Sequence, residues 1–188
     1  MKLVPTAWQT VGPFFHLGLD PLCCVELITP DTPGEHVEIE GTVRDGDRAP
    51  IPDALLEIWQ ADAHGKYSSE VRKVGNAPRT FGGFGRVPTD ENGRFRFTTV
   101  KPGPVSSFDG ELQAPHLNIS VFMRGLLLRL VTRMYFPDER NERDPILRMV
   151  EPARRTTLIA QPVDPAISHV LRWNIHLQGD QETVFFEI

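Results

Sequence analysis

The sequence contains very little cysteine and no long apolar run. Its only two cysteines are the neighbours Cys23 and Cys24, which cannot easily bridge each other, so no disulfide framework is expected. Residues 1–30 hold no basic segment followed by an apolar core, and no apolar run reaches the length of about 18 residues that a membrane-spanning helix needs. We therefore expect a cytoplasmic protein that is neither secreted nor inserted in a membrane.

Several kinds of functional motif are also absent. The net charge of -5 gives no electrostatic footprint for nucleic acid. There is no G-x-S-x-G nucleophile motif and no Walker phosphate loop. The six histidines form neither an H-x-H pair nor an H-E-x-x-H motif, so a metal site made of histidine alone is not expected.

What the sequence does have is many chain breakers and several β-strand patterns. Seventeen prolines and fifteen glycines divide the 188 residues into short segments, which favours β-structure over a helical bundle. Residues 37–43 place apolar or small side chains at every second position, the period of a half-buried strand. Residues 54–60 are apolar on both faces, which is typical of a central strand.

The rest of the chain continues this pattern. We predict further strands, each from β-forming or alternating side chains, near residues 94–100, 116–123, 128–136, 156–161 and 170–177, and a short strand or packed tail at the end. Asp144 and Pro145 form a helix start signal for residues 146–150. Residues 68–89 are expected to form a long functional or interfacial loop. The predicted fold is all-β: an antiparallel β-sandwich with an extended N-terminal arm, long loops and one short helix.

The chain is expected to consist of an arm, residues 1–35, and one sandwich domain, residues 36–188. The arm carries five prolines and many apolar side chains without a helical period. A free arm of this kind would expose more apolar surface than a soluble monomer usually tolerates. We expect it to pack against its own domain or against a partner, and the residues alone do not decide between the two.

Three segments carry a resemblance to a known family. They read EGTVRDGDRAPIPDALLEIWQADAHGKY, FGRVPTDENGRFRFTTVKPGP and QAPHLNISVF. In order and spacing they resemble the intradiol ring-cleaving dioxygenases, which are non-haem iron(III) enzymes that open catechols between the two hydroxyl-bearing carbons. The similarity extends over roughly residues 36–180.

The resemblance also implies a ligand set, which this sequence keeps only in part. Family members hold Fe(III) with two tyrosinates and two histidines, donors that suit a ferric ion. These positions fall on Tyr67, Val105, His116 and Asn118. Valine cannot donate to a metal, and a neutral amide oxygen is a poor substitute for imidazole. We therefore expect a degenerate site without catalytic iron, in which Tyr67 and His116 remain as relics.

One branch of the family is built from two homologous subunits, of which the β subunit holds the iron and the α subunit has an emptied site. The arm segment TAWQTVGPFFHLGL and the closing LQGDQETVFFEI are similar to the ends of that α subunit. The resemblance thus implies an iron-bearing β subunit as partner in a higher (αβ)n oligomer. It also implies opening of 3,4-dihydroxybenzoate (protocatechuate) by O2 to 3-carboxy-cis,cis-muconate in the β-ketoadipate pathway of aromatic degradation.

In this branch the working site lies between the subunits, and the α subunit supplies part of the substrate pocket. The implied substrate-binding residues here are Thr10, Gly12, Pro13 and Arg133. Without the resemblance, Arg133 would be interpreted as a solvated charge on a strand. With it, the guanidinium is expected to bind the substrate carboxylate, because its fork of donors can pair both oxygens.

Two other interpretations stay open at this point. The chain could be an autonomous intradiol enzyme whose iron is held by Tyr67, His116 and a carboxylate. It could also be a non-catalytic β-sandwich binding module, because that architecture hosts many functions. The iron content of the chain alone, and its co-purification with an iron-bearing homologue, would separate these hypotheses.

Overall fold

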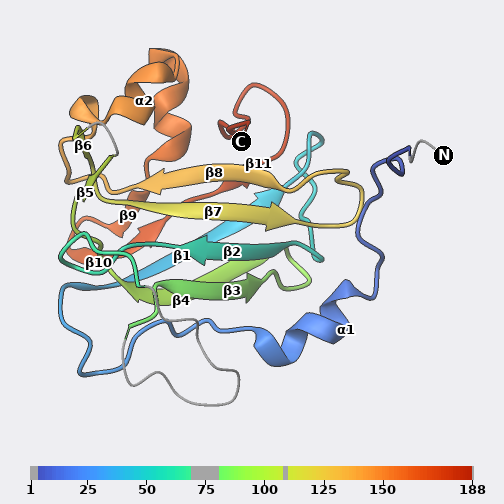
Figure 1. Cartoon of the computed structure of the whole chain (residues 1–188), viewed down its shortest axis with the longest axis horizontal. Coiled ribbons are helices and arrows are strands. Elements are labelled where there is room, and N and C mark those ends of the chain that lie inside the picture. Colours follow the sequence, from blue (N-terminus) through green and yellow to red (C-terminus); the bar gives the residue numbers. More distant parts are fainter. Residues whose placement is uncertain (1–3, 69–80, 108–109, 188) are drawn as a thin grey trace.

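Two β-sheets packed face to face form the body of the protein (Figure 1). The structure is a computed structural model and describes residues 4–68, 81–107 and 110–187. Apolar side chains from both sheets fill the space between them and form the main core. The predicted all-β sandwich is confirmed.

The first sheet is built around β1 (His36–Arg44). β4 (Arg94–Val100) pairs with it in antiparallel fashion, whereas β10 (Ile167–Arg172) and β11 (Ile175–His176) follow each other along its other edge in parallel. β9 (Gln161–Asp164) completes the sheet beside β10. This sheet therefore contains two parallel pairs beside its antiparallel ones, a mixture that the predicted antiparallel sandwich did not specify.

β1 shows why it is a strand. Its burial alternates residue by residue, as the sequence pattern predicts. Gly41 sits at its centre, where a Cβ would lie 1.8 Å from the carbonyl oxygen of Trp173 and 2.6 Å from the ring of Phe95. Only glycine fits this close approach of the three segments.

The second sheet has the order β3-β2-β7-β8, and all its pairs are antiparallel. Its strands are β2 (Leu55–Trp59), β3 (Phe84–Pro88), β7 (His116–Phe122) and β8 (Leu130–Tyr135). The predicted central position of β2 is confirmed. β3 corrects the predicted loop 68–89, of which residues 69–80 lie outside the described part of the chain.

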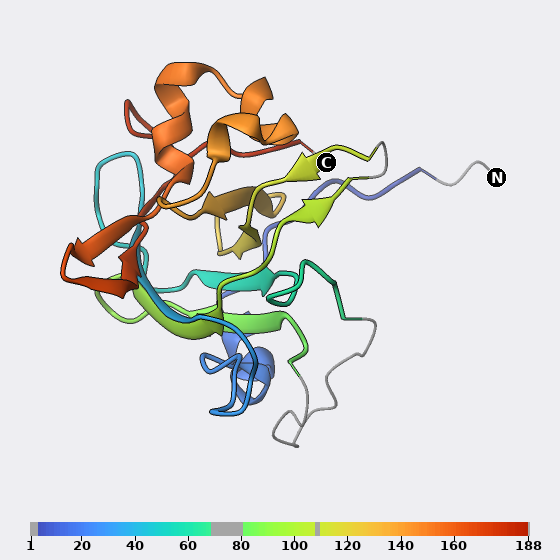
Figure 2. The same ribbon diagram turned by 90° about the vertical axis from the view of Figure 1, so that its left-hand side faces the viewer.

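Short helical segments and a small ribbon surround the sandwich (Figure 2). They are α1 (Phe15–Leu19), η1 (Asp20–Leu22), η2 (Asn141–Arg143), α2 (Pro145–Met149), η3 (Pro152–Leu158) and the β5–β6 pair, Val105–Ser106 with Leu112–Gln113. The helix start at Asp144 is confirmed, because its side chain accepts a hydrogen bond from the backbone N–H of Leu147. The predicted strand 156–161 is wrong: its first half is the end of η3, and β9 begins only at Gln161.

The N-terminal arm is partly helical and only partly packed. Residues 15–22 form α1 and η1, which the sequence pattern did not predict. Further along, Cys24 and Glu26 make isolated β-bridges to the two sheets, and Leu27 is buried in the core. Trp8, in contrast, is 72% exposed. Among the described residues, no helix has the length and apolarity needed to cross a membrane.

Candidate functional site

The outer face of the four-stranded sheet carries three of the predicted site residues, His116, Asn118 and Arg133. In the strand register, Asn118 lies opposite Trp59 on one side and Arg133 on the other, while His116 lies opposite Tyr135. Directly opposite residues of antiparallel strands point to the same face. The five side chains therefore share one surface, and the alternate residues of β7 face the core.

Tyr67 reaches this face through a tight turn. The Asp62 carboxylate accepts hydrogen bonds from the backbone N–H groups of His64 and Lys66, each at 2.9 Å. Gly65 has φ 76°, and a Cβ there would lie 2.0 Å from the carbonyl oxygen of Pro104, so the turn requires glycine.

The Tyr67 ring stacks on Trp59, and its hydroxyl oxygen accepts a hydrogen bond from Asn118. The two rings lie 5.7 Å apart between centroids and are 11° from parallel. Asn118 Nδ2 donates to the Tyr67 hydroxyl oxygen at 3.1 Å and to the Trp59 carbonyl oxygen at 3.3 Å. Because a carbonyl can only accept, the Trp59 contact fixes which end of the amide faces the tyrosine.

His116 is 2% exposed. Its Nδ1 lies 2.7 Å from the carbonyl oxygen of Ala114, so Nδ1 carries the proton and Nε2 presents a lone pair. Nε2 is buried, without a hydrogen-bond partner among the described residues. Burial first, and then the nearby Arg133 charge, lower the pKa of His116 to about 4.

Arg133 reaches toward the β5–β6 ribbon. Its Nη1 donates to the Gln113 side-chain oxygen at 2.7 Å. Arg133 is half-buried on the same face as His116 and Asn118, two of the predicted ligand positions. A cationic guanidinium thus lies beside His116 and Asn118, within the predicted iron-ligand region of this chain.

A buried carboxylate next to this face was missed by the sequence analysis as a site feature. Asp144 is fully buried and accepts from the Tyr135 hydroxyl at 3.0 Å, the Leu147 N–H at 2.8 Å and the Ala114 N–H at 2.9 Å. Burial, and then the Asp144 charge, raise the pKa of Tyr135. The helix start signal revealed Asp144, but its two partners outside α2 come from segments that only the fold brings together.

The residues present do not fit the family's iron. Val105 offers no donor atom, and the Tyr67 oxygen already accepts a hydrogen bond from Asn118. His116 Nε2 is buried and has no hydrogen-bond partner among the described residues. Within residues 4–68, 81–107 and 110–187, no three His, Cys, Asp or Glu side chains form a group that could hold a metal ion.

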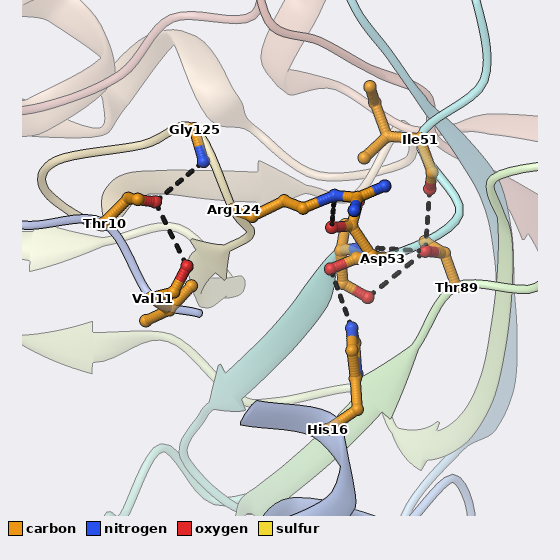
Figure 3. A network of polar contacts seen from close by, with 9 residues as sticks. Thr10, Val11, His16, Ile51, Asp53, Thr89, Arg124 and Gly125 are labelled. Atoms are coloured by element: carbon orange, nitrogen blue, oxygen red, sulfur yellow. Dashed lines mark hydrogen bonds and ion pairs between the residues drawn. The ribbon is translucent and has the colours of Figure 1, made fainter. Parts of the chain in front are cut away.

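The arm residues lie apart from Arg133. Thr10 Oγ1 accepts a hydrogen bond from the backbone N–H of Gly125, in the turn between β7 and β8 (Figure 3). Gly12 and Pro13 follow in the exposed part of the arm. Arg133 lies three residues beyond the first residue of β8, toward the opposite end of the hairpin. The two sets of predicted substrate contacts therefore do not form one pocket within this chain.

Comparison with known proteins agrees with this fold. The family described as Dioxygenase matches residues 23–179. The solved 3-chlorocatechol 1,2-dioxygenase from Rhodococcus opacus 1CP superposes with a TM-score of 0.61 at 22% identity, covering 94% of this chain and 69% of that one. The chain belongs to this dioxygenase family, and the resemblance found in the sequence is confirmed.

Two curated relatives specify the branch. The protocatechuate 3,4-dioxygenase alpha chain of Pseudomonas putida is 41% identical, over all of this chain and 98% of its own length. The beta chain of the same enzyme from Burkholderia cepacia is 38% identical over 68% of this chain and 56% of its own length. The match to the alpha chain thus includes the N-terminal arm.

Proposed function

We propose that this chain is the alpha subunit of a protocatechuate 3,4-dioxygenase, an oxidoreductase that opens 3,4-dihydroxybenzoate with O2 to 3-carboxy-cis,cis-muconate. The observation that carries the proposal is the 41% identity over the full length of an alpha chain. The donor set supports it, because the resemblance matches Val105 and Asn118 to positions where the family uses tyrosine and histidine.

In this proposal the iron belongs to a homologous beta subunit. Fe(III) held by that subunit would bind and activate the catechol, and this chain would contribute substrate binding and shielding from water. The existence of a beta chain similar to this one supports such a partnership. The exposed apolar side chains of the arm, among them Trp8 and Phe14, support a role in covering a partner.

The substrate contacts proposed for this chain are Thr10, Gly12, Pro13 and Arg133. An arginine stays charged when water is removed and can pair both oxygens of a carboxylate, which separates protocatechuate from plain catechol. Gly12 and Pro13 offer little side-chain bulk, so their backbone can approach a flat aromatic ring. Because Gly12 and Pro13 lie apart from Arg133, we expect the arm and the arginine to contact substrate at different parts of the subunit interface.

Co-expression with a beta-chain homologue tests the proposal. We expect the two chains to co-purify and to consume O2 with protocatechuate, whereas this chain by itself should consume none. The proposal would be overturned if the two chains did not co-purify and the beta chain alone consumed O2 with protocatechuate equally well.

A further inference from the structure

Arg133 lies among the four positions that the resemblance assigns to iron ligands. On β8 it stands directly opposite Asn118 of β7, on the outer face of the sheet. Side chains in such opposite positions begin about 4.5 to 5.5 Å apart at their Cβ atoms. Asn118 in turn donates to the hydroxyl oxygen of Tyr67 at 3.1 Å. One of the four positions is thus a direct neighbour of Arg133, and a second is bonded to that neighbour.

The other two positions also adjoin Arg133. Its Nη1 donates to the Gln113 side-chain oxygen at 2.7 Å, and Gln113 pairs with Val105 across the β5–β6 ribbon. His116 lies two residues before Asn118 on the same face of β7, which makes it a diagonal neighbour of Arg133 across the two strands. A single cation therefore borders all four positions.

The charge of Arg133 is not balanced by an ion pair. Among the described residues no carboxylate lies within ion-pair distance of it, whereas Arg86 on the same sheet face is paired with Glu57 at 2.7 Å. The buried Asp144 accepts its hydrogen bonds from Tyr135 and from two backbone N–H groups instead. An unpaired positive charge is thus fixed beside the predicted ligand positions.

His116 keeps one nitrogen atom that could bind a metal ion. Its Nδ1 lies 2.7 Å from the Ala114 carbonyl oxygen, so the buried Nε2 presents its lone pair, without a hydrogen-bond partner among the described residues. Burial and then the Arg133 charge lower the pKa of His116 to about 4, because both disfavour a positive charge on the ring. A metal ion at Nε2 would meet the same repulsion, which is strong where water is largely excluded.

We propose that Arg133 takes the place of a metal's charge among these four positions and keeps metal ions out, so that restoring the predicted ligands would not by itself allow a metal to bind. The lack of donors at Val105 and Asn118 is then one barrier, and the fixed cation is a second. A guanidinium has several N–H donors, of which Gln113 engages one, so this role leaves donors for a substrate carboxylate. The inference concerns this chain alone and does not depend on the proposed function.

The test compares Zn²⁺ binding by variants of the full chain. Asn118→His creates an H-x-H pair with His116, and imidazole is a good ligand for zinc. We expect the addition of Arg133→Gln to raise the Zn²⁺ affinity of this variant at least about tenfold in titration calorimetry, because the charge is removed. Arg133→Lys should leave the affinity low, because an ammonium group keeps the charge. Arg86→Gln, on the same face, is the matched control and should change nothing.

A second comparison uses iron. Val105→Tyr together with Asn118→His completes the predicted donor set, and bound iron is measured after incubation with ferric citrate and desalting. We expect at least about tenfold more iron per chain once Arg133→Gln is added. If the variants with Val105→Tyr do not fold, the Zn²⁺ comparison decides alone.

Two results would overturn the inference. One is equal metal binding with and without Arg133→Gln, including no binding in either case. The other is metal binding in Arg133→Lys as strong as in Arg133→Gln, which would show that charge is not the cause. Neither result bears on the proposed function, which would fail instead if the complex with a beta chain had no activity on protocatechuate.

Discussion

Asn118 donates a hydrogen bond to the hydroxyl oxygen of Tyr67 at 3.1 Å, so two of the positions predicted to match the family's iron ligands are bonded to each other. The same amide is tied to the Trp59 carbonyl, and Tyr67 stacks on the Trp59 ring. These contacts bind the side chains to one another and leave the tyrosine oxygen occupied. The arrangement stabilises an aromatic surface of the sheet.

Tyr67→Phe should leave catalysis nearly unchanged in the complex with the beta subunit. The variant removes one hydrogen bond at a half-exposed position and keeps the ring stack. We expect kcat/KM for protocatechuate to change by less than about twofold. Steady-state oxygen uptake measures this, and a loss of most of the turnover would show that Tyr67 acts in catalysis.

Asp144 should be important for stability, because it is buried and accepts three hydrogen bonds. Asp144→Ala leaves the Ala114 and Leu147 N–H groups and the Tyr135 hydroxyl without their acceptor, at a cost of roughly 3 to 5 kcal/mol. Tyr135→Phe removes one of the three bonds and should cost about 1 to 2 kcal/mol. Urea unfolding measures both, and equal costs would contradict this account of the network.

His116 should make the protein less stable in acid. Its folded pKa of about 4 lies below the ordinary value of 6.5, so below pH 6.5 the unfolded chain binds a proton that the folded chain does not. Stability is complete above pH 6.5 and falls toward pH 4, by up to roughly 3 kcal/mol from this group. Burial and nearby arginines also lower the pKa of His176, which adds a further acid-sensitive contribution.

The difference between the parent and His116→Gln isolates the His116 share. Unfolding free energies measured from pH 7.5 to pH 4 should fall less steeply in this variant, whose side chain does not titrate. Parallel pH profiles for the two proteins would contradict the buried, neutral state of His116.

Arg133→Ala should weaken protocatechuate binding in the complex by roughly 2 to 5 kcal/mol, as expected when a charged partner of a bound carboxylate is removed. Arg133→Lys should recover little, because an ammonium group cannot form the paired contact. Arg172→Ala, which breaks the ion pair with Glu40 on the other sheet, is the control. An unaltered kcat/KM in Arg133→Ala would show that Arg133 does not bind the substrate, and its bond to Gln113 would then be structural.

Sequence patterns correctly predicted those helices and strands whose formation depends on consecutive residues. Apolar and polar residues alternate in β1, and Asp144 with Pro145 marks the start of α2. The structure contains both the strand and the helix. β3 was missed because a glycine and a proline in FGRVP weaken its strand pattern, while pairing with β2 supplies what the pattern lacks. Residues 156–158 have β-forming side chains, yet they end η3, so tertiary context overrode their propensity.

The site was predictable only where a single position carried the signal. The predicted loss of two iron ligands rests on the single positions Val105 and Asn118, which the resemblance to the family singles out. The parallel pairing of β1 with β10 joins residues that are about 130 positions apart in the sequence. The Asp53–Arg124 ion pair joins the loop between β1 and β2 to the turn between β7 and β8. Long-range contacts of this kind leave no periodic trace in the sequence.

The most direct test of the central claim is the iron content of this chain purified alone and of the same chain in complex with a beta-chain homologue. We predict no bound iron and no oxygen uptake with protocatechuate for the separate chain, and iron in proportion to the beta chain for the complex. One iron per separate chain, together with ring-opening activity, would contradict the account.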